Sequence, residues 1–362
     1  MVFLLAFLFS APAHAFPEMV RHHYVNCNSC HASPNGGGLL TEYGRGMASE
    51  VLSTWNYENE SLFLHGAIKP EKIPKAVNVG GDIRVLQVHR EDRSVREGRF
   101  ILMQSQVEAG VTVGPVMAVA AFGKPNRENQ IEPEFTRFYL LANATETLQF
   151  RAGRILPPFG LNVAQHTVPT RQALGFGYDS ERNTLEAHWN GEEWHGAFSA
   201  SQSRLQSRIG ENERAASFQL ERFFNDSHRV GLSTWSGESD RQKRWLGSLH
   251  GIFGFTKHLY LLSEVVLQSK KMKTPRAERE EGIYHFGRFG YEITKGVHLL
   301  ALEEFSKSNL KATKTQFVSF GAGALWYPRP HFELELTLNQ RKNLQTSREF
   351  EDYAYLTLHY YL

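Results

Sequence analysis

The second part of the chain, from about residue 77 to the end, alternates apolar and polar positions in segments of about ten to fourteen residues. Alternation with a period of two places the two sets of side chains on opposite faces of a β-strand. The clearest segment is 331–339, HFELELTLN, in which every second residue is apolar. Similar patterns predict further strands near 77–89, 98–112, 116–123, 134–142, 147–155, 183–190, 193–202, 214–224, 228–236, 244–255, 258–268, 282–293, 296–306, 314–326 and 351–361.

About sixteen strands, an even number, suit a closed antiparallel outer-membrane β-barrel. The connections between the predicted strands alternate between tight turns, such as 114–115 and 225–226, and longer polar loops. Such barrels have short periplasmic turns and longer extracellular loops. A periplasmic N-terminus would place every short turn and the C-terminus on the periplasmic side. The alternative is a soluble sandwich, whose alternating strands would pack against a second sheet. Longer loops are expected near 90–97, 124–133, 156–182, 203–213, 237–243, 269–281, 307–313 and 342–350.

The aromatic residues and the end of the chain also favour a membrane barrel. The last predicted strand, 351–361, carries apolar side chains on one face, which resembles the terminal segment of outer-membrane barrels. Aromatic residues near strand ends suit the girdles at the two membrane interfaces, whereas the alternative is that they are ordinary strand aromatics. These residues are Trp189, Trp194, Trp235, Trp245, Trp326 and Tyr327.

The longest predicted loop, 156–182, would be the third outer loop, which in many porins folds into the lumen. Four of its residues could line a constriction, or they could be exposed polar residues of a loop. They are His166, Arg171, Asp179 and Glu181.

The N-terminus is typical of an exported protein. An apolar run over residues 2–9 precedes Ala13-His14-Ala15, which has the small-x-small form of a signal-peptidase site. We therefore expect a signal peptide over 1–15, although no Lys or Arg precedes the apolar run. After Ala15 no stretch approaches the roughly 20 apolar residues of a membrane helix.

Composition limits the class of partner. The 362 residues include 40 Lys and Arg against 38 Asp and Glu, a formal charge of +2. No broad positive field of the kind that nucleic-acid-binding proteins use is expected from this balance, so we expect no nucleic-acid partner.

The only two cysteines lie in one motif. Cys27 and Cys30, followed by His31, have the C-x-x-C-H form of a c-type haem attachment site. Two thiols at this spacing can each add to a vinyl group of one porphyrin, and the histidine then lies beside the iron as an axial ligand. The alternatives are a disulfide, a thioredoxin-like redox pair and half of a zinc site. The export signal favours one covalently attached c-type haem.

The second axial ligand of the iron stays open in the sequence. Apolar positions between Leu39 and Trp55 recur at helical spacing, and we expect a short helix that covers one haem face. Met47 on that helix is one candidate ligand, or it is an ordinary core methionine. His22 and His23 are alternatives, and the position could also be open.

This arrangement resembles the fused monohaem cytochrome-porins of the outer membrane, which are best known from bacteria that oxidise ferrous iron outside the cell. The resemblance rests on the haem motif and on Pro34, Gly38 and the Tyr43-Gly44-Arg45 triplet that follow it. The stretches 151–154 and 158–160 also resemble porin-type barrels. The resulting domains are a haem segment over 16–60, a linker over 61–76 and a barrel over 77–362.

The resemblance implies an electron-transfer protein rather than an enzyme with an acid, base or nucleophile. Electrons would pass between an extracellular redox partner, ferrous iron in the family, and a periplasmic carrier. Because the linker is short, we expect the haem segment inside the barrel lumen. The first alternative is a solute-transporting porin whose haem segment is a plug or sensor, and the second is a soluble periplasmic haem protein.

Overall fold

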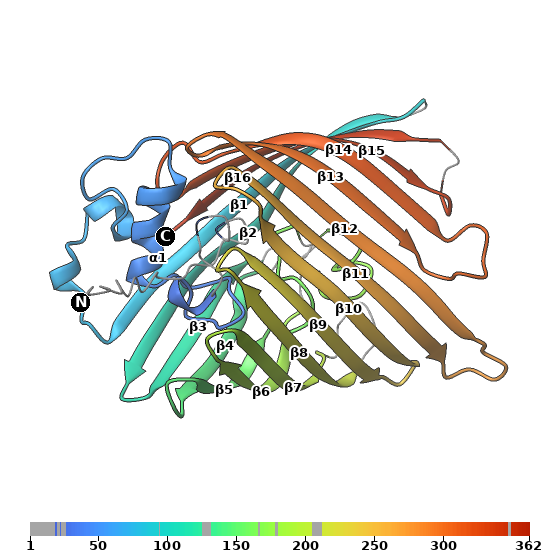
Figure 1. Cartoon of the computed structure of the whole chain (residues 1–362), viewed down its shortest axis with the longest axis horizontal. Coiled ribbons are helices and arrows are strands. Elements are labelled where there is room, and N and C mark those ends of the chain that lie inside the picture. Colours follow the sequence, from blue (N-terminus) through green and yellow to red (C-terminus); the bar gives the residue numbers. More distant parts are fainter. Residues whose placement is uncertain are drawn as a thin grey trace, which may run out of the picture.

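The structure is a computed structural model that describes residues 19, 22, 27–93, 95–124, 132–165, 167–177, 180–204, 212–346 and 349–362. In this part of the chain, sixteen antiparallel strands form one closed barrel, in which β1 pairs with β16 (Figure 1). The prediction of a sixteen-stranded barrel is confirmed, and each strand overlaps its predicted range. The strands are β1 (Val77–Glu91), β2 (Arg96–Val113), β3 (Val116–Lys124), β4 (Glu134–Asn143), β5 (Leu148–Ile155), β6 (Arg182–Asn190), β7 (Trp194–Gln202), β8 (Arg214–Phe224), β9 (His228–Glu238), β10 (Gln242–Gly254), β11 (Leu259–Met272), β12 (Arg279–Thr294), β13 (Val297–Lys307), β14 (Gln316–Trp326), β15 (Phe332–Asn343) and β16 (Glu351–Tyr361).

The two faces of the barrel wall have opposite polarity. On β7 the outward Phe198 is 54% exposed, whereas the inward Ser199 is buried and lies 2.7 Å from the inward Ser217 of β8. Large apolar side chains such as Leu185 and Leu232 are likewise exposed on the outside. An apolar outer face with a polar interior is the arrangement of a membrane-spanning barrel. A soluble sandwich would bury the apolar face instead, so that alternative is wrong.

Several strands are longer than the sequence predicted. The loop expected at 90–97 shrinks to 92–95, and those expected at 237–243 and 269–281 shrink to 239–241 and 273–278. These strand ends are polar on both faces, so apolar alternation does not reveal them. On the β1–β2 hairpin, ion pairs at 3.5 Å (Arg90 to Glu97) and 3.7 Å (Arg96 to Glu91) continue the pairing beyond the apolar band.

The segment 156–177 folds back into the barrel. Its apolar side chains pack against inward-facing residues of β8 to β12, so this loop does not lie on the outside of the barrel. One cluster joins Phe159, Leu174 and Phe176 to Trp235, Ala215, Leu246, Val266 and Tyr284. The other joins Leu161, Val163 and Val168 to Ile252, Tyr260, Leu262 and Phe286.

The N-terminal helix is shorter than expected. The α-helix α1 covers Glu42–Met47 and continues as the π-helical turn η3 (Ala48–Leu52). Thr41 begins the helix as its N-cap, because its side chain accepts a hydrogen bond of 3.1 Å from the Gly44 backbone. Leu39 therefore lies in an extended stretch before the helix, and Trp55 lies beyond its end. Three short 3₁₀ turns are η2 (Cys27–Ser29), η4 (Phe63–Gly66) and η5 (Pro70–Lys72).

None of the helices in the described part of the chain is long and apolar enough to cross a membrane.

Candidate functional site

Residues 27–40 lie against the inner face of the barrel wall. Arg151 of β5 donates to the Ser33 hydroxyl at 2.7 Å, and Asn35 donates to Glu186 of β6 at 3.4 Å. On the other side of the segment, the Asn78 side chain of β1 donates to the Leu40 carbonyl at 2.6 Å. Both charged partners are buried inward-facing side chains. The dark-blue segment in Figure 1 overlaps the barrel wall, in agreement with these contacts.

Glycines let this segment turn and approach the wall. Gly36, Gly37 and Gly38 have φ angles of 74°, 73° and 70°, a conformation that other residues rarely adopt. The turn is followed by Leu39, which is 3% exposed. Its side chain packs over Gly110 of β2, where a Cβ atom would lie only 2.8 Å from a Leu39 methyl group.

The haem motif itself is compact. The His31 backbone donates to the Cys27 carbonyl at 3.1 Å, which closes the turn between the first cysteine and the histidine. His31 is 8% exposed, and its Nδ1 atom lies 3.3 Å from the Gly38 carbonyl oxygen. With Nδ1–H donating there, Nε2 keeps the lone pair that a metal requires. The imidazole also lines a lumen cavity of about 290 Å³.

Cys30 of the motif lies in an apolar cluster. It is 3% exposed and packs with Met47, Leu52 and Leu300. Gly44 of α1 approaches it closely, because a Cβ atom at Gly44 would overlap the Cys30 carbonyl oxygen. Close packing against Cys30 therefore explains why the Tyr43-Gly44-Arg45 triplet has a glycine at its centre. Neither Cys27 nor Cys30 forms a disulfide, so that alternative does not fit the structure.

Arg45 of the same triplet fixes the helix to the barrel. Its guanidinium donates to the Val79 carbonyl of β1 and to the Asn78 side chain, both at 3.0 Å. Hydrogen bonds of Leu40 and Arg45 thus join the helix and the residue before its N-cap to the first strand.

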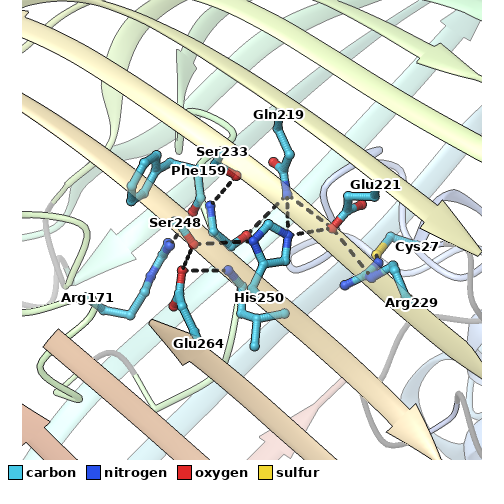
Figure 2. Close-up of polar contacts among 12 residues, drawn as sticks. Cys27, Phe159, Arg171, Gln219, Glu221, Arg229, Ser233, Ser248, His250 and Glu264 are labelled. Atoms are coloured by element: carbon cyan, nitrogen blue, oxygen red, sulfur yellow. Dashed lines mark hydrogen bonds and ion pairs between the residues drawn. The ribbon is translucent and has the colours of Figure 1, made fainter. Parts of the chain in front are cut away.

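Cys27 adjoins a chain of polar side chains on the inner wall (Figure 2). The Arg229 guanidinium of β9 lies 3.6 Å from the Cys27 sulfur and 3.5 Å from Glu221 of β8. His250 of β10 lies 3.1 Å from the same Glu221 carboxylate. Burial raises the pKa of the Cys27 thiol, although the positive charge of Arg229 opposes this effect. A neutral sulfur, as in a thiol or a thioether, suits this position.

The chain of polar contacts continues to the inward loop. Ser248 lies 3.3 Å from the His250 ring nitrogen and donates to Glu264 of β11 at 2.8 Å. Glu264 also accepts from the backbone of Leu161 in the loop at 3.2 Å. A continuous row of polar groups therefore connects Cys27 with the loop 156–177, as Figure 2 shows.

Apart from Cys27, the members of this polar row were not predicted from the sequence. A signal for them was present, because Glu221, Arg229, His250 and Glu264 are charged or titratable residues on the polar face of predicted strands. The sequence does not reveal the strand register, which places these residues of four different strands at the same level along the barrel axis.

The structure describes two of the four loop residues that were expected at a constriction, and both line a cavity. Arg171 is 2% exposed, donates to the Phe159 carbonyl at 2.7 Å and lines the 290 Å³ cavity. Glu181 lines the same cavity. The interpretation of Arg171 as an exposed loop residue is therefore wrong. His166 and Asp179 lie outside the described residues.

The candidate second axial ligands also lie in different surroundings. Met47 is 6% exposed and shares the apolar cluster of Cys30. His22 lies 4.0 Å from Glu292 of β12 through its Nε2 atom. His23 lies outside the described residues. The identity of this ligand stays a prediction.

The groups around the motif fit a c-type haem. Two cysteines that form no disulfide are present at the required spacing, and the His31 ring is oriented by a backbone carbonyl through Nδ1. Metal-ligating histidines typically engage their other nitrogen in this way. The apolar cluster beside Cys30 adds the burial that a porphyrin requires.

Known structures share the fold. The chain is similar to OmpT, an outer membrane protein of Vibrio cholerae, with a TM-score of 0.60 and 11% identity over 80% of this chain and 99% of that one. It is also similar to the anion-selective porin from Comamonas acidovorans, with a TM-score of 0.59 and 13% identity over 79% and 99%. The outer membrane channel DcaP of Acinetobacter baumannii gives 0.58 and 10% over 79% and 97%. No protein-family model and no curated protein sequence matches the chain.

Proposed function

We propose that the protein is a c-type cytochrome of the outer membrane that carries one haem inside a porin-like barrel. It would pass electrons between an extracellular redox partner and a periplasmic carrier, as the resemblance to monohaem cytochrome-porins implies. The observation that carries the proposal is the position of the Cys27 to His31 motif on the inner wall of the barrel, with the Nδ1 atom of His31 bonded to a backbone carbonyl.

Each residue of the motif has a role in this proposal. Cys27 and Cys30 would hold the porphyrin through thioether bonds, and the Nε2 atom of His31 would bind the iron. When bound, the haem supplies reversible one-electron transfer at a potential that depends on ligation and burial. Arg151 and Glu186 hold the segment through Ser33 and Asn35, so they fix where that transfer takes place.

The filled lumen favours electron transfer over solute transport. Porins of 16 to 18 strands usually enclose an aqueous channel. In this barrel, residues 27–40 and 156–177 occupy the interior. The cavities that these residues help to line measure about 290, 140 and 40 Å³. These two segments narrow the route for solutes, whereas an electron needs no open channel. The division into a haem segment and a barrel belongs to the same proposal.

The test begins with haem-stained electrophoresis of separated membrane fractions. We expect covalent haem in the outer-membrane fraction and none in a Cys27→Ser/Cys30→Ser variant that still folds. Ferrous iron added to intact cells should then reduce the haem, as seen in its absorbance. Covalent haem without a response to any external redox partner would favour the porin with a haem-bearing plug or sensor. Absence of covalent haem would contradict both.

A further inference from the structure

The outer face of the barrel carries a basic row at the end with the longer loops. Adjacent strands β6 to β12 align seven outward-facing residues in direct register across this end. Four of the seven are cations and one is an acid. The row, in order, is Asn183, Gln202, Arg214, Glu238, Lys243, Lys271 and Arg279.

A groove lies next to this basic row, toward the middle of the barrel. The neighbouring cross-strand row consists of Leu185, Ala200, Ala216, Ser236, Trp245 and Ser269. Its small side chains lie between the large Leu185 and Trp245, which are 66% and 46% exposed. Residues of both rows line a groove of about 1210 Å³.

The charges of the basic row are only partly compensated. Glu238 binds Lys243 at 3.0 Å and Lys273 at 2.7 Å. Arg214, Lys271 and Arg279 form no ion pair with a carboxylate of the described chain. Glu281 is an exposed acid next to Ser269 in the neighbouring row. Five cations and two carboxylates leave this surface positive.

The groove faces the outer leaflet if the barrel has the usual orientation. The short turns 295–296 and 327–331 contact the N-terminal region through Thr54, so that end carries the termini, and the basic row lies at the opposite end. Short turns are periplasmic in outer-membrane barrels. Below the groove, the outward Phe198, Phe218 and Leu267 continue the apolar band. The strands concerned run from green to orange in Figure 1.

We propose that this groove binds one phosphorylated glycolipid of the outer leaflet, the lipid A part of lipopolysaccharide. Its phosphates would contact Arg214, Lys271 and Arg279, because guanidinium and ammonium groups form charge-assisted hydrogen bonds with phosphate. One acyl chain would lie over Ala200 and Ala216, where no large side chain prevents close contact. The site is independent of the haem and would therefore stand if the proposed electron transfer failed.

The test uses the full-length protein, purified in detergent and freed of lipid, with native mass spectrometry to count and titrate bound deep-rough lipopolysaccharide. We expect one bound molecule. In Lys271→Gln/Arg279→Gln, two cations are lost, and at about 1 kcal/mol for each basic residue the affinity should fall roughly 30-fold. Dephosphorylated lipopolysaccharide should bind the parent protein at least as weakly as the intact lipid binds the variant, because the variant still has Arg214.

Matched variants separate charge and shape from general damage. Arg93→Gln/Arg96→Gln removes two cations from the β1–β2 hairpin at the same end of the barrel, and its affinity should stay at the parent value. Ala216→Trp should fill the groove and abolish one-to-one binding, whereas Ala301→Trp on the outer face of β13 should not. Heat-shifted electrophoretic mobility confirms that each variant is folded.

Three results would overturn the lipid A site. They are equal affinity of the parent protein and the two groove variants, equal binding of intact and dephosphorylated lipid, and equal binding of phosphatidylglycerol. The last result would show a surface that attracts any anionic lipid.

Discussion

Two segments occupy the barrel interior, and different forces hold them there. Residues 156–177 are held mainly by apolar packing against inward side chains of β8 to β12. Residues 27–40 combine apolar packing of Cys30 and Leu39 with hydrogen bonds from polar groups of the wall, such as the buried Arg151 and the half-buried Asn78. Apolar packing has no preferred direction, whereas hydrogen bonds to buried charges fix orientation. The loop buries two clusters that include large apolar side chains, whereas residues 27–40 contribute few and mostly small apolar side chains and depend more on directed hydrogen bonds.

The largest effect is expected from the cysteines, which belong to residues 27–40. Cys27→Ser/Cys30→Ser should remove all covalent haem, because no thioether bond can form. Neither cysteine forms a disulfide, so the barrel should still fold. Haem staining and heat-shifted mobility on the same gel measure both properties. Retained covalent haem in the variant would contradict the assignment of the motif.

The buried pair of Arg151 and Glu186 tests the anchoring by polar groups. Their side chains are 3% and 0% exposed and lie 2.9 Å apart. Arg151→Leu should lower the free energy of unfolding by roughly 3–5 kcal/mol, because it leaves a buried carboxylate unpaired. Urea unfolding in detergent measures this loss.

A second variant separates the unpaired charge from lost packing. Arg151→Leu/Glu186→Leu should recover much of the stability, because neither charge is then left alone. If the double variant is as unstable as the single one, packing around Arg151 rather than its charge holds the segment.

Phe176 offers the corresponding test for the apolar loop. Its ring stacks on Phe159 at 4.7 Å and meets Trp235 edge-on at 5.0 Å. Phe176→Ala should cost roughly 3–4 kcal/mol and loosen the loop. Single-channel conductance in planar bilayers should rise, whereas an outward Phe198→Ala should leave it unchanged. An unchanged conductance of Phe176→Ala would mean that the loop does not obstruct the lumen.

The same contrast explains how much the sequence could predict. All sixteen strands and the positions of the tight turns followed from alternation and turn residues, because the membrane requires an apolar outer face along every strand. The Cys27 to His31 motif could also be recognised, since its spacing is local, and its role in haem attachment stays a prediction. The inward fold of residues 156–177 followed only from the resemblance to porins, although inward apolar residues such as Tyr260 and Phe286 were visible in the strands.

What the sequence could not predict depends on register. The row from Cys27 through Arg229, Glu221 and His250 comes from a turn and three strands whose heights are set by the pairing around the barrel. The basic row on the outer face has the same origin. Alternation reports which face a residue occupies but not its neighbour on the next strand, so sites built across strands stayed hidden.

The smallest expected effect concerns residues 57–66, which lie between the N-terminal helix and β1. His331, in the turn before β15, is fully buried, and its ring lies 3.0 Å from the Glu60 carbonyl oxygen through Nε2. Its Nδ1 atom is buried without a partner among the described residues. Burial lowers the pKa of His331, and the nearby His65 acts in the same direction.

When residues 57–66 detach, His331 would regain its usual pKa near 6.5 and bind more protons than in the docked state. The docked state should therefore be most stable above pH 6.5 and lose stability as the pH falls below that value. The pKa of Glu60 changes nothing in this window. Burial, the largest single cause, would raise it, but the hydrogen bonds from Arg329 and the Tyr57 backbone, together with nearby positive charge, keep the pKa below its usual value.

Hydrogen exchange of residues 57–66 between pH 7.5 and 5.5, corrected for the intrinsic rate, measures this loss of protection. His331→Asn is the matched control, because asparagine tolerates the positive φ of 73° at this position and does not titrate. Its protection should not depend on pH in this range. Equal pH dependence in the parent protein and in His331→Asn would assign the effect to a group other than His331.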